Sequence, residues 1–380
     1  MSMHEASMPA FPVAAVDAAA LRRRALWIML LGKLLGSWGL AWDIRWHLTI
    51  GRDSFWIPPH LLTYLGVTMV ALVSFGVLAV ETWRERDGAR APGAVRIAGL
   101  TGTRGFHLAA GGIALTLAAA PVDDLWHRLF GIDVTLWSPP HLLGLAGGQV
   151  NAAGCLVIAL EVPLARWARF VAVAGSAALL LGSLEVVADP AVPLAFVQGH
   201  AFFFAWAVLG ALLFTFPLVL AARLTRARAF PLVVAAGVVV LYLVASKVAD
   251  LGFALVQPVS VIDEAIAADP SSPIAIAHAM ARFGRDRTPG RADALRWFTV
   301  VAALAVVAVD ARRRPALAAA AFGAALVLVS GLSLARAPAL AAARPEMVDV
   351  VLALVLAPLA AVGSARAATS VGPRLAPTVS

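Results

Sequence analysis

The stretch WDIRWHLTIGRDSFWIPPHLL, residues 42–62, places three Trp, two His and two Asp between long apolar runs. The chain of 380 residues is 61% hydrophobic and 14% charged, whereas soluble domains rarely exceed about half apolar residues. Apolar runs of about 18 residues or more recur along its whole length, without the two-residue alternation of a membrane barrel. The sequence therefore predicts an all-α, polytopic transmembrane helical bundle built from repeated helix hairpins.

About ten membrane spans are expected from these apolar runs. They lie near residues 25–42, 60–82, 106–122, 141–161, 167–187, 196–220, 230–256, 297–311, 316–335 and 347–364. The expected organisation is a flexible cytoplasmic tail (1–24), a duplicated hairpin half (25–161), additional helices with a long extracytoplasmic loop near 257–296 (162–365), and a disordered tail (366–380).

Arginines gather in every second connection between the predicted spans. They are Arg22–Arg24, then Arg84, Arg86, Arg90, Arg96 and Arg104, then Arg166 and Arg169, then Arg223, Arg226 and Arg228, then Arg312–Arg314. The positive-inside rule assigns these connections and both termini to the cytoplasmic side of the cell (inner) membrane. The basic segment 282–296 is an exception, since it falls in a connection assigned to the outer side. The rule accounts for the net charge of +8 without a nucleic-acid partner.

The polar stretch is written a second time as DDLWHRLFGIDVTLWSPPHLL, residues 123–143, which indicates an internal repeat of helix, polar loop and helix. The matching pairs are Asp43 and Asp123, Trp46 and Trp126, His47 and His127, Asp53 and Asp133, and His60 and His141. A third, decayed copy is expected at Glu185, Asp189 and His200, which follow similar offsets.

The repeated residues have the chemistry of a metal site. Asp43 and His47 lie four residues apart and therefore project from one face of a helix end. His60 opens the next helix after Pro58-Pro59, and proline favours a helix start. We expect each hairpin to gather one carboxylate and two imidazoles, a set suited to non-haem iron, copper or zinc. In the second hairpin these are Asp123, His127 and His141.

The neighbouring residues have supporting roles in this interpretation. Trp46 and Trp126 would limit water access, Asp53 and Asp133 would orient ligands or pair with loop cations, and Asp124 would add a carboxylate. The alternative is that Trp, Asp and Arg anchor the helix ends at the membrane surface. Repeated packing alone would also keep the pattern, but the second copy retains the ligand-type residues while the residues between them change.

The two stretches resemble one integral membrane subunit of the copper membrane monooxygenases, the particulate methane and ammonia monooxygenases. The family's first motif stands here as Asp43, Trp46-His47, Arg52-Asp53 and Pro58-Pro59-His60, and its second as Asp123, His127 and His141. The resemblance covers residues 26–160. Asp123 replaces an asparagine of the family, which adds negative charge, and the chain carries extra spans.

The resemblance implies copper, with iron or zinc as other candidates, bound by one set in each hairpin near the extracytoplasmic face. It implies dioxygen activation against a small apolar or weakly polar substrate. The implied partners are the lipid bilayer and other monooxygenase subunits.

Other functions fit the same ligands. One is a metal- or proton-coupled transporter, with Lys247 and Asp250 as part of a path instead of a simple ion pair. A second is a membrane protein that binds metal without turnover, and a third is a structural membrane protein with no metal.

Overall fold

The structure is a computed structural model that describes residues 17–51, 54–130, 136–283, 289 and 293–375. Its elements are α1 (Ala18–Thr49), α2 (Pro58–Arg86), β1 (Val95–Ile97), β2 (Leu100–Gly102), α3 (Arg104–Phe130), α4 (Pro139–Glu161), α5 (Arg166–Ala188), α6 (Ala191–Gln198), η1 (His200–Phe202), α7 (Ala205–Thr225), α8 (Phe230–Val256), α9 (Ile262–Ala268), α10 (Pro273–Ala281), α11 (Asp293–Val309), α12 (Pro315–Leu334), η2 (Pro338–Ala343) and α13 (Met347–Leu375). The predicted all-α, polytopic bundle is confirmed.

Nine helical segments of the described chain are long and apolar enough to cross a membrane, if α5 is counted with α6 and η1 with α7. Each of them overlaps one predicted span. The remaining predicted span, 297–311, corresponds to α11 with 17 residues. A helix of that length measures about 26 Å, slightly less than the ~30 Å hydrocarbon core of a bilayer.

The two N-terminal hairpins pack backbone against backbone because glycines line their contacts. A Cβ on Gly66 of α2 would lie 2.4 Å from the carbonyl oxygen of Gly32 on α1. A Cβ on Gly112 of α3 would lie 2.3 Å from the backbone nitrogen of Asn151 on α4. The Asn151 side chain donates a 2.8 Å hydrogen bond to the carbonyl of Ala109, as expected for a polar residue that joins two membrane helices.

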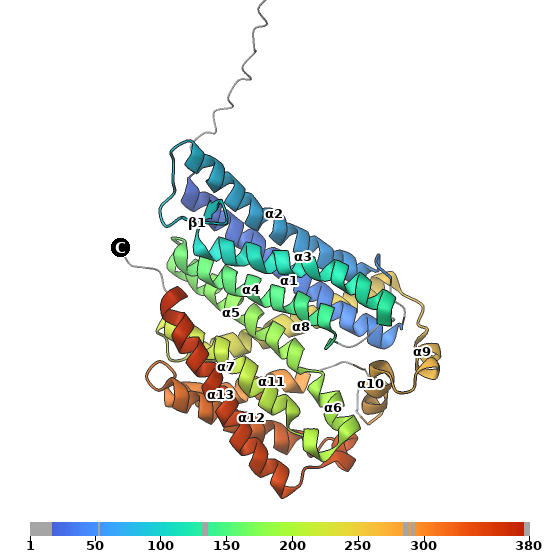
Figure 1. Cartoon of the computed structure of the whole chain (residues 1–380). Coiled ribbons are helices and arrows are strands. Elements are labelled where there is room, and N and C mark those ends of the chain that lie inside the picture. Colours follow the sequence, from blue (N-terminus) through green and yellow to red (C-terminus); the bar gives the residue numbers. More distant parts are fainter. Residues whose placement is uncertain (1–16, 52–53, 131–135, 284–288, 290–292, 376–380) are drawn as a thin grey trace, which may run out of the picture.

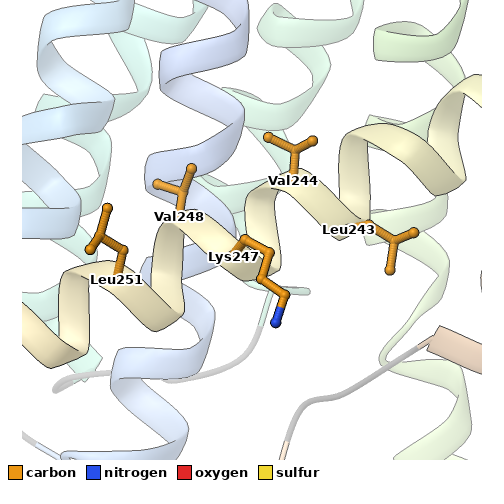
Figure 2. Close-up of a pocket in the computed structure, with 5 residues that line it drawn as sticks. All are labelled: Leu243, Val244, Lys247, Val248 and Leu251. Atoms are coloured by element: carbon orange, nitrogen blue, oxygen red, sulfur yellow. The ribbon is translucent and has the colours of Figure 1, made fainter.

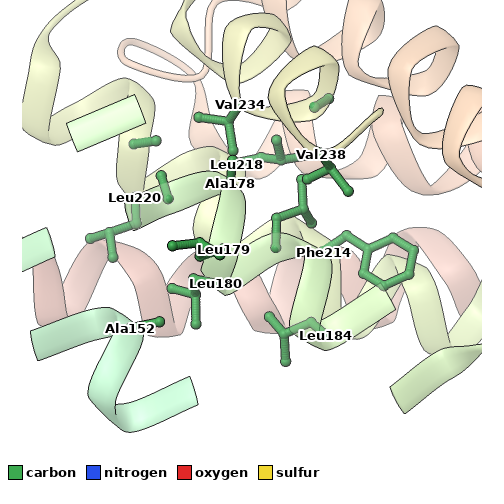
Figure 3. Close-up of a cluster of buried hydrophobic side chains, with 14 of the residues drawn as sticks. Ala152, Ala178, Leu179, Leu180, Leu184, Phe214, Leu218, Leu220, Val234 and Val238 are labelled. Carbon is green, nitrogen blue, oxygen red and sulfur yellow. The ribbon is translucent and has the colours of Figure 1, made fainter. Parts of the chain in front are cut away.

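The largest hydrophobic cluster joins these hairpins to the rest of the bundle. Figure 3 shows its central part, where leucines of α5 meet Phe214 and Leu218 of α7 and Val234 and Val238 of α8. In Figure 1 the α1–α2 and α3–α4 hairpins lie on one side of the molecule, and α11, α12 and α13 lie on the other. The helices α9 and α10 sit at one end of the bundle, opposite the end where α13 stops.

Three connecting or terminal segments differ from expectation. The segment 366–375, expected to be disordered, continues α13 to Leu375, because Ala365 and Ala368 are buried against the bundle. The long connection near 257–296 contains α9 and α10, and α1 begins at Ala18, within the expected N-terminal tail. The arginine-rich connection after α2 holds the antiparallel pair β1–β2, whose turn uses positive φ at Ala98 (51°) and Gly99 (81°).

Candidate metal site

The first predicted ligand set comes together where α1 ends and α2 begins. Asp43 and His47 lie on the last two turns of α1, and His60 follows Pro58-Pro59, which occupy the first positions of α2. The Oδ1 atom of Asp43 lies 3.1 Å from Nε2 of His60 and 3.5 Å from Nε2 of His47. The three side chains are 17–21% exposed, so they are largely shielded from solvent and lipid.

These distances fit donor atoms around one metal ion. Ligand oxygens and nitrogens lie about 2.0–2.2 Å from a transition metal, so two donors at 90–110° are about 2.9–3.5 Å apart. All three donor atoms lie within 4.8 Å of one another, and within the described residues no other group of three such side chains has this spacing. The Oδ1 atom of Asp43 is buried and accepts no hydrogen bond of good geometry from the described residues. A buried carboxylate oxygen without a hydrogen bond is costly, and a bound cation would remove that cost.

The end of α1 is fixed by aromatic packing against α8. Trp42 and Trp46 are 7% and 5% exposed, and both rings contact Phe253, which stacks on Trp46 at 5.9 Å between centroids. Arg45 donates a 2.8 Å hydrogen bond to Asp250, and its guanidinium lies 5.3 Å from the centre of the Phe253 ring. Both tryptophans and Arg45 alternate with Asp43 and His47, so this packing sets the rotation of the helix turn that carries two ligands.

Replacement of Gly252 by alanine is expected to disturb this packing. The added Cβ would lie 2.4 Å from the Trp42 ring, so the ring or the α8 backbone must move. Overpacking of this kind costs about 1–3 kcal/mol. We expect a lower unfolding temperature in detergent and weaker metal binding, measured by thermal unfolding and by competitive metal titration.

Gly76→Ala is the matched control, since a Cβ on Gly76 of α2 meets nothing within 4 Å. If Gly252→Ala were as stable as Gly76→Ala and bound metal equally well, the close contact between Gly252 and Trp42 would be without consequence.

The second ligand set lies only partly within the described residues. Oδ1 of Asp123 is 3.7 Å from Nε2 of His141, and both side chains are 34% exposed. His127 belongs to α3, but its side chain is outside the described part, as are Asp133 and its first-copy counterpart Asp53. Binding of a metal by Asp123, His127 and His141 therefore stays a prediction.

Two further residues predicted near the second set have protein partners. Asp124 pairs with Arg128 at 2.9 Å, and the Trp126 ring lies 4.4 Å from the Phe130 ring.

Glu185, Asp189 and His200 do not gather at one point, which corrects the expectation of a third ligand set. Arg296 of α11 takes both acids: it donates two hydrogen bonds of 2.9 and 2.6 Å to Asp189, and its Nε lies 3.2 Å from Glu185. His200 instead contacts the carbonyl oxygen of Arg344. Arg296 is 4% exposed, so its charge neutralises these two acids and belongs to the bundle interior.

The Lys247–Asp250 pair is present, at 3.5 Å, and Asp250 is shared with Arg45. Figure 2 shows Lys247 on α8 beside four apolar side chains, Leu243, Val244, Val248 and Leu251, which line a shallow hollow of about 350 Å³ with it. The Lys247 side chain is 83% exposed on this apolar surface. The ion-pair interpretation therefore fits the geometry, and the polar chain Lys247–Asp250–Arg45 ends next to the α1 turn that holds the ligands.

Lys33 is a polar residue that the sequence interpretation missed. It lies near the middle of α1 and donates a 2.8 Å hydrogen bond to the carbonyl of Gly148 on α4, which joins the two hairpins. Lys33 and Lys247 are the only lysines of the chain, while its other basic residues are arginines. A lysine inside a long apolar run was the available signal, since ionisable residues at membrane depth are usually paired or functional.

Comparison with protein-family models, curated protein sequences and solved structures found no match to this chain. The likeness to a membrane subunit of the copper membrane monooxygenases therefore rests on the motif residues alone. What the geometry adds is the convergence of Asp43, His47 and His60, which the offsets predicted.

Proposed function

We propose that this integral membrane protein binds copper at Asp43, His47 and His60 and activates dioxygen, in the manner of a membrane subunit of a copper monooxygenase. The observation that carries the proposal is the meeting of one carboxylate and two imidazoles at the junction of α1 and α2. Two imidazoles and a carboxylate would suit iron or zinc as well, and the motif likeness favours copper. Bound copper would supply the redox chemistry needed to reduce dioxygen.

The residues around the site have separable tasks in this proposal. The Asp43 carboxylate provides the negative charge that offsets the cation, and the two imidazoles provide neutral donors. Trp42 and Trp46 exclude water on the side of α8, which raises the strength of electrostatic interactions at the site. Tyr64 stands between the His60 ring, 5.8 Å away, and the Phe55 ring, 4.9 Å away.

The substrate in this proposal is small and apolar or weakly polar, and reaches the site from the bilayer. Phe55 and Trp56 are 61% and 70% exposed beside the Tyr64–His60 pair, so an apolar surface leads to the site. Aromatic residues of this kind are typical of the membrane–water interface. The other subunits of a copper monooxygenase would be the protein partners.

The site belongs to the extracytoplasmic side in this proposal. The arginine-rich connections mark the opposite side as cytoplasmic by the positive-inside rule. Arg296 ends the basic segment that stands as an exception to this rule. Its burial against Asp189 and Glu185 removes it from the loop charges that the rule concerns.

The test is copper binding followed by two functional assays on the purified full-length chain. We expect a Cu(II) electron paramagnetic resonance signal with nitrogen coupling from two imidazoles, reduced in His60→Ala. We expect copper-dependent dioxygen uptake in membranes that contain the partner subunits. Copper flux in liposomes without dioxygen uptake would replace the proposal by transport, and a chain that binds no copper, iron or zinc would refute it.

A further inference from the structure

The last backbone carbonyls of α1 are all taken by one distant segment. The Nε2 atom of His278 lies 2.6 Å from the carbonyl oxygen of Leu48. The Ser260 hydroxyl donates a 2.7 Å hydrogen bond to the carbonyl of Thr49. The backbone N–H of Val261 donates a 2.8 Å hydrogen bond to the carbonyl of Ile50. Three successive carbonyls at a helix end thus have partners more than 200 residues away in the sequence.

This segment, residues 260–278, connects α8 to α10 and includes α9. Gly51, which follows α1 with φ of 76°, lies so close to Ile262 that a Cβ there would be 3.2 Å from the Ile262 Cα. Figure 1 shows α9 and α10 at the end of the bundle where α1 finishes. We call Ser260, Val261 and His278 the α1 clamp.

A helix end needs such partners because its last four carbonyls have none within the helix. Without them the final turn frays, and side chains on that turn lose their fixed direction. His47 lies in this final turn of α1, directly before Leu48. The stability of the final turn therefore decides whether Nε2 of His47 stays within reach of Asp43.

We propose that the α1 clamp positions His47 for metal binding, with His278 as its principal positioning residue. The inference rests on the proposed metal site and adds a role for residues 260–278. To donate to the Leu48 carbonyl, His278 must carry its hydrogen on Nε2, so this nitrogen is not a metal ligand. His278 acts through the backbone of α1 and does not touch the ion.

The same contact requires a reciprocal effect of the metal on the clamp. If the clamp raises metal affinity, bound metal must stabilise the clamp by the same free energy. We expect amide hydrogen exchange in residues 260–278 and in the last turn of α1 to slow when copper binds.

The test compares His278→Ala and His278→Gln with the wild-type chain in competitive copper titrations. We expect His278→Ala to weaken copper binding about 10-fold or more and to broaden the Cu(II) resonance spectrum, as the loss of an outer partner of a metal ligand typically does. Glutamine keeps a side-chain N–H donor, so His278→Gln should recover much of the wild-type affinity. Ser260→Ala should weaken binding in the same direction and by less.

His107→Ala is the matched control, since both ring nitrogens of His107 contact backbone carbonyls, of Thr103 and Leu100, at the opposite end of the bundle. This variant should lose stability without losing copper affinity. If His278→Ala folds and binds copper as the wild type does, or if glutamine is no better than alanine, the inference is overturned while the metal site stands. A wild-type chain without copper overturns both.

Discussion

Replacement of His47 and His60 together by alanine is expected to lower the copper content of the purified chain by one ion per molecule. The variant keeps only the Asp43 carboxylate of the group, and a single carboxylate does not hold a transition metal against dialysis. Each single replacement should weaken binding by at least about 100-fold, because even indirect partners of metal ligands contribute 10–100-fold. The measurement is metal analysis after dialysis against a copper buffer.

His107→Ala is the control for this loss as well, since His107 bonds to backbone carbonyls of the β1–β2 hairpin region and not to another ligand-type side chain. A double variant that retains the full wild-type copper content, with an intact fold, would show that the α1–α2 junction does not hold the ion.

Arg296→Met is expected to be the most destabilising single change outside the site. It would leave Glu185, 1% exposed, and the partly buried Asp189 without their shared cation. Removal of one partner from a buried ion pair typically costs about 3–5 kcal/mol. The measurement is thermal or denaturant unfolding in detergent, where we expect a large loss of the folded fraction.

The triple variant Arg296→Met, Glu185→Gln, Asp189→Asn should recover much of this loss, because no buried charge is left without a partner. Arg128→Met is the control: its pair with Asp124 is exposed on both sides, and such pairs contribute at most about 1 kcal/mol. Equal stability of Arg296→Met and Arg128→Met would contradict the account of the buried network.

Hydropathy predicted the helices of this chain because each membrane span needs a long apolar run, whatever its neighbours are. The Pro-Pro pairs correctly marked the starts of α2 and α4. The segment 366–375 was missed because its alanines look the same in a packed helix and in a disordered tail. Only the contacts of Ala365 and Ala368 with the bundle decide between the two.

The convergence of Asp43, His47 and His60 was predictable because all three lie in one hairpin, where sequence offset sets distance. The partners of Glu185 and Asp189 were not, because Arg296 comes from a helix more than 100 residues later. The same holds for His278 and Ser260, which reach the end of α1 from another part of the chain. Sequence patterns indicate which faces are polar, whereas the choice of distant partners depends on how the helices pack.

The central claim is that one ion lies between Asp43, His47 and His60. The most direct measurement is an anomalous difference map at the copper edge from crystals of the copper-loaded protein. We predict a peak about 2.0–2.2 Å from Oδ1 of Asp43 and from Nε2 of both histidines. A map with no peak at the junction of α1 and α2, or coordinates in which the two imidazoles turn away from Asp43, would contradict the account.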